Sequence, residues 1–177
     1  EALKQFTPDI EIYSIDEAFL SFTGLRCEDH AAYGREIRQT VMKWTGISVS
    51  VGIAKTKTLT KVANEIAKKH PQYGGVVDLS KSPERELDVY LGQLGVADVW
   101  GVGHQYAKLL RAQGIKTARD LKYADMKWIR KRMTVMGERC VLELRGVLCF
   151  GLDRYPMPKK GIRSSRSFGK SVTKREE

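Results

Sequence analysis

The first eighty residues switch repeatedly between strand-like and helix-like spacing of their apolar side chains. Ile10 to Phe22 is rich in β-branched and aromatic residues on both sides of Asp16 and Glu17, which predicts two strands that meet at this acidic pair. The segments that follow predict a helix over 31–44, a strand over 47–53, a helix over 57–69 and a strand over 76–79. This order predicts an α+β fold in which helices cover one face of a mixed sheet.

The second half of the chain predicts helices joined by short loops. Ser82 and Pro83 have the pattern of an N-cap followed by a first helical residue, so we place a domain boundary near Ser80. Residues 94–115 have the pattern of a helix-hairpin-helix, and residues 126–146 add basic helical segments. This half is therefore expected to be all-α.

The C-terminal part has the composition of a connection into a further unit. Prolines at 156 and 158 predict an extended linker, and the side chains from Arg163 onward, Arg166 among them, alternate as in a strand. The predicted organisation is a first unit over 1–80, a helical unit over 81–151, a linker over 152–162 and the first strand of a third unit within 163–177.

Charge is divided unevenly between the two halves of the chain. The formal net charge is +10, but residues 1–90 hold 12 Lys and Arg against 13 Asp and Glu, whereas residues 91–177 hold 19 against 8. A nearly neutral half followed by a basic half indicates a chemical unit joined to a surface that binds a polyanion, and nucleic acid is the polyanion we expect. The alternative is an ordinary soluble surface rich in Lys and Arg.

Composition argues against several classes of protein. No run of about twenty apolar residues occurs and the first residues lack the apolar core of a signal peptide, so we expect neither a membrane span nor secretion. The cysteines are odd in number and form no Cys-x-x-Cys pair, so we expect buried, reduced thiols and neither a disulfide framework nor a zinc site. The residues concerned are Cys27, Cys140 and Cys149, and the isolated His30, His70 and His104 receive no catalytic role.

The acidic pair is the first candidate for chemistry. Asp16 and Glu17 lie between two apolar runs, and a carboxylate is costly to remove from water unless it is paired or bound to a cation. A divalent metal ion would meet that cost. The alternative is a hairpin tip whose two carboxylates point into water.

One face of the helix predicted over 57–69 is the second candidate. Lys57, Lys61, Asn64 and Lys68 share this face, and Leu59, Val62 and Ile66 lie opposite. Ammonium groups suit phosphate oxygens, so the face could clamp a triphosphate or a phosphodiester. A solvated helix face is an equally good interpretation.

The turn of the predicted helix-hairpin-helix is the third candidate. Gly101 and Gly103, on either side of Val102, permit a tight turn and a close approach of the backbone to a ligand. The amides that open the following helix, on which Lys108 lies, could hold one DNA phosphate without reading a base. A purely structural helix-turn-helix is the alternative.

These motifs, in this order and spacing, resemble the Y-family translesion DNA polymerases and most of all their UmuC branch, the catalytic subunit of bacterial polymerase V. The motifs are Ser14-Ile15-Asp16-Glu17-Ala18-Phe19, Val51-Gly52-Ile53-Ala54-Lys55-Thr56-Lys57, Ala67-Lys68-Lys69, Gly74-Gly75-Val76-Val77-Asp78-Leu79, Val99-Trp100-Gly101-Val102-Gly103 and Arg166-Ser167-Phe168-Gly169. The resemblance covers essentially the whole chain. It implies a palm up to about Ser80, a helix-hairpin-helix thumb to about Gly151, and a linker into the little finger.

The resemblance also implies roles for single residues. Asp16 would bridge two Mg²⁺ ions and Glu17 would hold the ion that activates the primer 3′ hydroxyl, in two-metal nucleotidyl transfer. Lys68 would bind the incoming nucleotide triphosphate and Ser14 would lie near the primer end. We assign the remaining candidates, Gly101, Val102, Gly103, Lys108 and Arg166, to primer and DNA binding.

The implied partners are primer-template DNA and deoxynucleoside triphosphates in the bacterial cytoplasm, in translesion synthesis during the SOS response to DNA damage. A UmuD′-type subunit, a recombinase filament and a sliding clamp are further partners that the UmuC likeness implies. Binding is expected to follow the DNA backbone, so affinity should fall steeply with salt and vary little with sequence.

The sequence also departs from the family. The family's first metal motif, an Asp followed by Asn, Phe and Tyr, does not occur, nor does a fingers subdomain, and the chain begins at Glu1 without Met. We therefore expect a piece that supplies two of three metal carboxylates and does not polymerise alone. A non-catalytic helix-hairpin-helix module that binds DNA is the competing hypothesis, whereas a nucleotidyl cyclase with a palm-like sheet leaves the basic second half unexplained.

Overall fold

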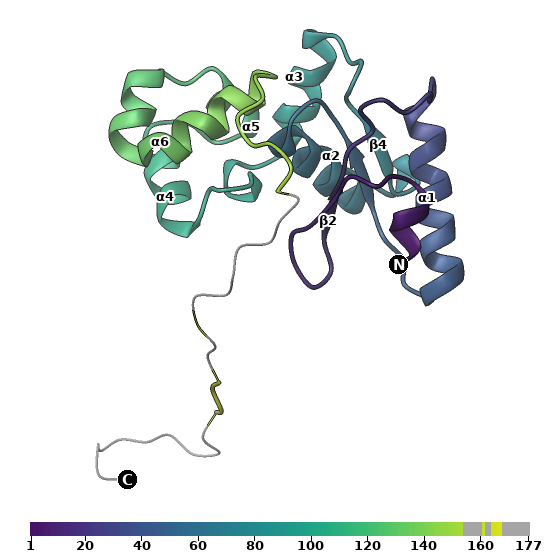
Figure 1. Cartoon of the computed structure of the whole chain (residues 1–177). Coiled ribbons are helices and arrows are strands. Elements are labelled where there is room, and N and C mark those ends of the chain that lie inside the picture. Colours follow the sequence, from purple (N-terminus) through teal and green to yellow (C-terminus); the bar gives the residue numbers. More distant parts are fainter. Residues whose placement is uncertain (154–160, 162–163, 168–177) are drawn as a thin grey trace, which may run out of the picture.

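The computed structural model describes residues 1–153, 161 and 164–167 of the chain (Figure 1). In chain order the elements are η1 (Ala2–Gln5), β1 (Ile10–Ile12), β2 (Ala18–Leu20), α1 (His30–Thr45), β3 (Val51–Ile53), α2 (Lys57–Lys69), η2 (Pro71–Tyr73), β4 (Val76–Asp78), α3 (Glu84–Gln93), η3 (Val96–Asp98), α4 (His104–Ala112), α5 (Ala118–Lys122) and α6 (Met126–Leu144). Strands occur only before residue 80 within the described part, and helices α3 to α6 follow. The α+β class predicted from the sequence is confirmed.

The strands form two small sheets where the sequence predicted one mixed sheet. β1 and β2 are an antiparallel hairpin, and β3 and β4 are a parallel pair connected through α2. A parallel pair needs a crossover connection, which helix α2 supplies between β3 and β4. The hairpin therefore lies beside the β3–β4 pair without being hydrogen-bonded into it as a further strand.

Helices α1 and α2 cover opposite faces of the β3–β4 pair, which differs from the predicted cover on one face. A Cβ built on Gly34 of α1 would meet the Val51, Ile53 and Val76 side chains, whereas a Cβ built on Gly52 would meet the backbone of α2 at 2.2 Å from the Asn64 nitrogen. Neighbouring residues of a strand point to opposite faces. Gly52 therefore faces α2, whereas Val51 and Ile53 face α1. The missing side chain at this position is what lets α2 approach the strand so closely.

Two helix starts follow from residues that can accept a backbone hydrogen bond. The Thr56 hydroxyl accepts from the Leu59 amide at the start of α2, and Thr117 forms a capping box with Asp120 at the start of α5. Helix α3 instead begins at Glu84 behind Pro83, one residue later than predicted, and no side chain caps it. The start of α2 at Lys57 is the one predicted from the sequence.

The helix over 126–144 is two helices joined at a kink. Thr134 has φ 63° and ψ −167°, and its hydroxyl accepts from the Met136 amide at 3.4 Å. The interruption of the helical backbone at this residue redirects the second part, which ends at Leu144.

Within the described residues no helix has the length and hydropathy needed to cross a bilayer.

The main core runs across the domain boundary predicted near Ser80. It combines Leu59, Val62 and Ile66 of α2 with side chains from α3 to α6, such as Leu110 and Leu144. A smaller cluster joins Ile37 and Val41 of α1 to Phe6. The apolar face predicted for α2 is therefore the surface on which the helical half packs, and the boundary itself stays a prediction.

Two sequence predictions differ from the described structure. The strand predicted from Ile47 begins only at Val51. Ile47 is 62% exposed, and the Val49 carbonyl accepts a hydrogen bond from the Arg38 guanidinium at 2.9 Å in place of a strand partner. The linker and final strand lie mostly outside the described residues, and Ser164 to Ser167 carry no regular secondary structure.

Candidate functional site

The acidic pair lies in the turn of the β1–β2 hairpin. The Tyr13 and Ser14 amides both donate to the Glu17 carbonyl, at 3.0 and 3.1 Å, and this closes the turn around Asp16. Alternation along β1 and β2 ends here, which is why the apolar runs flank the two carboxylates without burying them. The turn exposes Ile15 completely, at 104% of its reference area.

The two carboxylates have different surroundings. Asp16 is exposed, and its Oδ1 accepts from the Ser14 hydroxyl at 2.7 Å. Glu17 is 36% exposed and its Oε1 is ion-paired with Lys61 Nζ. The hairpin tip open to water, which was the alternative reading of the sequence, describes Asp16, whereas Glu17 is held by a lysine.

Two lysines of α2 fasten the hairpin to the body of the protein. Lys57 Nζ pairs with Glu11 Oε2 and lies 5.0 Å from the centre of the Phe19 ring, and both charged side chains are nearly buried, at 12% and 11% exposure. Lys61 pairs with Glu17 one helical turn later. Lys57 and Lys61 of the predicted lysine face are thus ion-paired with carboxylates of this chain. Glu11 was not among the predicted site residues, and the signal for it in the sequence is its place between the apolar Ile10 and Ile12.

The other predicted lysine is free of such pairs. Lys68 is exposed and makes no ion pair with any residue that the structure describes. It lies two turns beyond Lys61 on α2, outside the lining of the groove around the acidic turn. Its assignment to the nucleotide triphosphate stays a prediction.

An open groove of about 1140 Å³ runs past the acidic turn. It is lined by the hairpin, by strand β3 and by the first turns of α2, and Leu148 to Leu152 close one side. Ser14, Asp16 and Glu17 lie along it, as does Lys61. The structure therefore places three predicted site residues on one hollow surface.

The glycine turn is the second predicted element. Gly101 has φ 85°, a conformation that favours glycine, and the Val102 side chain is buried beneath the turn. Gly103 occupies the N-cap position of α4 with no side chain capping the helix, so the first amides of α4 are open to a ligand. Lys108 is exposed on the same helix.

Aromatic side chains bring the glycine turn and the hairpin together. The Trp100 ring lies 5.7 Å from the Tyr13 ring and 6.0 Å from the Phe19 ring, measured between centroids. The remaining predicted DNA contact, Arg166, is exposed in a segment without regular structure, and no contact joins it to the groove. The structure thus brings together the acidic turn and the glycine turn, but not Lys68 or Arg166.

The described residues contain no group of three or more His, Cys, Asp or Glu side chains that could hold a metal ion. The chemistry of the pair still suits a hard cation, because Mg²⁺ is commonly held by one or two carboxylates together with water and substrate phosphates. Asp16 is open to such an ion, whereas Glu17 would have to exchange Lys61 for it.

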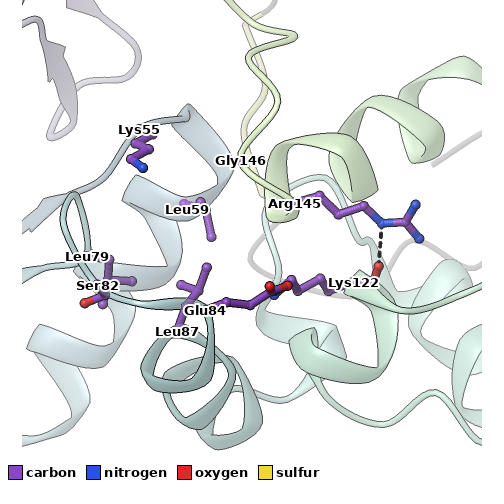
Figure 2. A pocket seen from close by; sticks show the side chains of 9 residues that line it. All are labelled: Lys55, Leu59, Leu79, Ser82, Glu84, Leu87, Lys122, Arg145 and Gly146. Atoms are coloured by element: carbon purple, nitrogen blue, oxygen red, sulfur yellow. Dashed lines mark hydrogen bonds and ion pairs between the residues drawn. The ribbon is translucent and has the colours of Figure 1, made fainter.

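A second, smaller pocket of about 260 Å³ lies between the N-terminal end of α2 and the helical half (Figure 2). Lys122 lies beside it with 4% of its side chain exposed, paired with Glu84 at 3.1 Å and Asp88 at 2.8 Å. Burial alone would lower the pKa of Lys122, but hydrogen bonds to Asp88, Glu84 and Tyr123 hold it above its ordinary 10.5. Arg145 donates to the Lys122 carbonyl at 2.7 Å, as the dashed line shows. None of the predicted site residues lines this pocket.

The cysteines take no part in either pocket's chemistry. Burial, and to a lesser extent the Glu143 carboxylate, raises the pKa of the Cys140 thiol to about 12, so this thiol stays protonated. Cys27 and Cys149 are half-buried, which differs from the full burial expected of all three.

The fold matches that of DNA polymerases of the Y family. The crystal structure of DinB from Sulfolobus solfataricus superposes with a TM-score of 0.61 at 28% identity, over 80% of this chain and 40% of that one. The α+β fold of this chain is thus shared with part of a DNA polymerase of known structure.

Sequence comparison leads to the UmuC group within that class. The impB/mucB/samB family matches residues 1–65. Protein UmuC of Salmonella typhimurium is 51% identical over 178 residues, which is 99% of this chain and 42% of that protein. DNA polymerase IV of Protochlamydia amoebophila is 32% identical over 94% of this chain and 45% of that protein. The resemblance to UmuC-like Y-family polymerases is confirmed, and the chain spans less than half the length of the relatives it matches.

Proposed function

We propose that this chain is the palm and thumb part of an error-prone DNA polymerase that extends primers across damaged template. The observation that carries the proposal is the exposed Asp16, next to Glu17, on an open groove, on a hairpin whose Tyr13 contacts Trp100 at the glycine turn. The similarity to protein UmuC and to DNA polymerase IV over nearly the whole chain supports it.

In this proposal Asp16 and Glu17 would hold two Mg²⁺ ions, whose charge would activate the primer hydroxyl and offset that of the triphosphate. Asp16 would be a ligand for both ions, and Glu17 would be a ligand for the one at the primer end after exchanging Lys61 for it. Ser14 holds the Asp16 carboxylate in place through its hydroxyl. Lys68 binds the triphosphate of the incoming nucleotide.

The helical half then holds the DNA. The open amides after Gly103 bind a primer phosphate, Val102 supports the turn from beneath, and Lys108 adds positive charge on the same helix. Arg166 contacts the DNA backbone from the third unit. We place the palm over residues 1–80, the thumb over 81–151, the linker over 152–162 and the start of the little finger over 163–177, within a bacterial cytoplasm.

The test is the replacement Asp16→Asn in the polymerase that contains this chain. Primer extension should fall by about three orders of magnitude or more, because a metal-bridging carboxylate is lost, while affinity for primer-template DNA changes less than two-fold. Asp98→Asn is the matched control, since Asp98 is exposed in a pair with Lys69 away from the groove. Full activity of the Asp16→Asn variant would refute the proposal.

The 177-residue chain by itself should bind DNA weakly and should not extend a primer, because only two of the three metal carboxylates expected in this family are among its residues. Extension by the isolated chain that depends on Mg²⁺ would contradict this. UmuD′-type, recombinase and clamp partners are part of the same proposal, and pull-down with the purified proteins tests each of them.

A non-catalytic DNA-binding module is the second candidate. The observation in its favour is the ion pair between Glu17 and Lys61, which neutralises one of the two carboxylates in the structure. Under this reading Asp16→Asn changes neither extension nor DNA binding, while changes in the glycine turn still weaken the binding.

A further inference from the structure

The acidic hairpin turn is not tied to the rest of the protein by sheet hydrogen bonds. Strands β1 and β2 pair with one another, and β3 and β4 form a separate sheet among the described residues. Side chains must therefore fix where the turn lies. On one side these are Lys57 and Lys61 of α2, which pair with Glu11 and Glu17.

On the other side the contact comes from the glycine turn. Trp100 Nε1 donates a hydrogen bond to the Tyr13 hydroxyl oxygen at 2.9 Å, and the two rings meet edge to face with an interplanar angle of 79°. The opposite neighbour of Tyr13 is Lys61, whose ammonium group lies 5.9 Å from the ring centre. Tyr13 therefore lies between α2 and the helical half, one residue before the turn that carries Ser14, Asp16 and Glu17.

Trp100 is itself held firmly. Its carbonyl oxygen accepts from the Cys140 thiol of α6 at 3.4 Å, and its ring lies 5.4 Å from that of Phe150, edge to face. It directly precedes Gly101, so its backbone is part of the glycine turn. A single residue is thus joined to the hairpin, to α6 and to the turn.

We propose that Trp100 is a positioning residue that sets the separation between the acidic turn and the glycine turn through its hydrogen bond to Tyr13. This inference rests on the proposed function. A primer whose end reaches Asp16 and whose backbone lies on the glycine turn must meet both at once, and small errors in position are costly in such reactions. The indole N–H is the one donor of this side chain, so Trp100→Phe keeps a smaller aromatic ring but removes the bond, and Tyr13→Phe removes the acceptor with its ring unchanged.

The first test measures the separation without any activity. Nitroxide labels are placed at the exposed positions Ile15 and His104, after Cys27 and Cys149 have been replaced by Ser, and the distance distribution is recorded by pulsed electron paramagnetic resonance. The distribution should be narrow in the parent and at least about two-fold broader in the Trp100→Phe and Tyr13→Phe variants. An unchanged width in both variants overturns the proposal.

Trp128→Phe is the matched control. Trp128 is a half-buried tryptophan of α6 that packs against the main core without touching Tyr13. The same change of side chain there should lower the melting temperature to a similar degree and leave the distance distribution narrow. Broadening in the Trp128→Phe variant as well would show general loosening and would also overturn the proposal.

The second test measures turnover in the polymerase that contains this chain. Trp100→Phe and Tyr13→Phe should each lower kcat about ten-fold while KM for primer-template changes less than two-fold, and the double variant should be no slower than either single one. A parallel loss of DNA affinity and kcat, as expected of a merely destabilised protein, counts against positioning. If the parent does not extend primers, the proposed function fails, and the distance measurement alone then decides whether Trp100 sets the separation.

Discussion

The carboxylate of Glu17 is ion-paired with the ammonium group of Lys61, which also lies against the face of the Tyr13 ring. A cation that binds Glu17 must displace this ammonium group or share the carboxylate with it, and two positive charges a few ångströms apart repel one another. The lysine therefore competes with any metal ion at the hairpin turn.

Replacing Lys61 by Met should strengthen binding of Mn²⁺ to this chain, by roughly five-fold at low salt, because the competing charge is gone. Isothermal titration with MnCl₂ measures the dissociation constant. Lys69→Met is the control, since it removes the same charge from α2 where the partners are Glu65 and Asp98. Equal affinities in the parent and the Lys61→Met variant would show that the ion pair does not oppose the metal.

The two glycines of the glycine turn should respond differently to Ala. At Gly101, φ 85° strains any side chain, so Gly101→Ala should cost about 1–2 kcal/mol of folding free energy. Gly103 has φ −73°, and a Cβ there meets nothing within 4 Å, so Gly103→Ala should fold as well as the parent.

Gly103→Ala should nevertheless weaken DNA binding about ten-fold, because the added methyl group stands where the DNA backbone approaches the amides of α4. Fluorescence anisotropy with a primer-template duplex at several salt concentrations measures this, and the loss should be the same for unrelated DNA sequences. Gly92→Ala, at another open position on α3, serves as the control. Undiminished affinity would remove the glycine turn from the DNA-binding surface.

Glu143 should contribute more to stability than Glu138, the other acidic residue of α6. Its fully buried carboxylate accepts from the Thr58 amide at 2.8 Å and from the Cys149 and Phe150 amides at 3.0 and 2.9 Å. Glu143→Gln turns one acceptor into a donor that faces N–H groups, so unfolding in urea should show a loss of about 2–4 kcal/mol. Glu138→Gln, which breaks an accessible pair with Arg130, should cost less than about 1 kcal/mol. Similar losses for both variants would contradict the importance of burial.

The pair between Lys122 and Asp88 predicts how stability depends on pH. Burial alone would raise the pKa of Asp88, but hydrogen bonds from Lys122 and Tyr123 hold it below its ordinary 3.8. Its contribution is therefore present above pH 4 and is lost as the pH falls through the lowered value. The raised pKa of Lys122 acts at the other end, with a contribution present below pH 10.5 that is lost as the pH rises beyond it.

The variant Lys122→Met should lose about 2–3 kcal/mol near pH 7, since Asp88 keeps its charge without the ammonium group. The difference from the parent should shrink below pH 4, where Asp88 becomes protonated in the variant. Urea unfolding between pH 3 and pH 8 tests this, with Lys127→Met on the exposed surface of α6 as the control. A difference that stays constant over this range would contradict the assignment to charge.

The elements that the sequence predicted well are those governed by local chemistry. Helix α2 has the predicted bounds, because its apolar stripe and the preceding Thr56 hydroxyl define it without help from the rest of the chain. The prediction of a strand from Ile47 was wrong at its start, since β3 begins only at Val51 and the Val49 carbonyl accepts from the Arg38 guanidinium of α1. The alternation of side chains along this segment cannot reveal a hydrogen bond from another element to its backbone.

The candidate site was predictable in part for a similar reason. Asp16 and Glu17 stand out in an apolar stretch, and the glycine turn stands out by its composition. The partners that place them, Lys61 for Glu17 and Trp100 for Tyr13, lie 44 and 87 residues away in the chain. Contacts over such separations come from tertiary packing and leave no periodic trace in the sequence.

The shared core of α2 and the helical half limits how such proteins can be recombined. Glu143 of α6 accepts a hydrogen bond from the Thr58 amide, and Leu59, Val62 and Ile66 pack on α3 to α6. The parts before and after residue 80 therefore share one core and cannot be exchanged separately without disturbing it. A chimera that takes its helical half from a relative would inherit a foreign surface against α2. Exchanging α2 together with α3 to α6 would keep these contacts native to one parent.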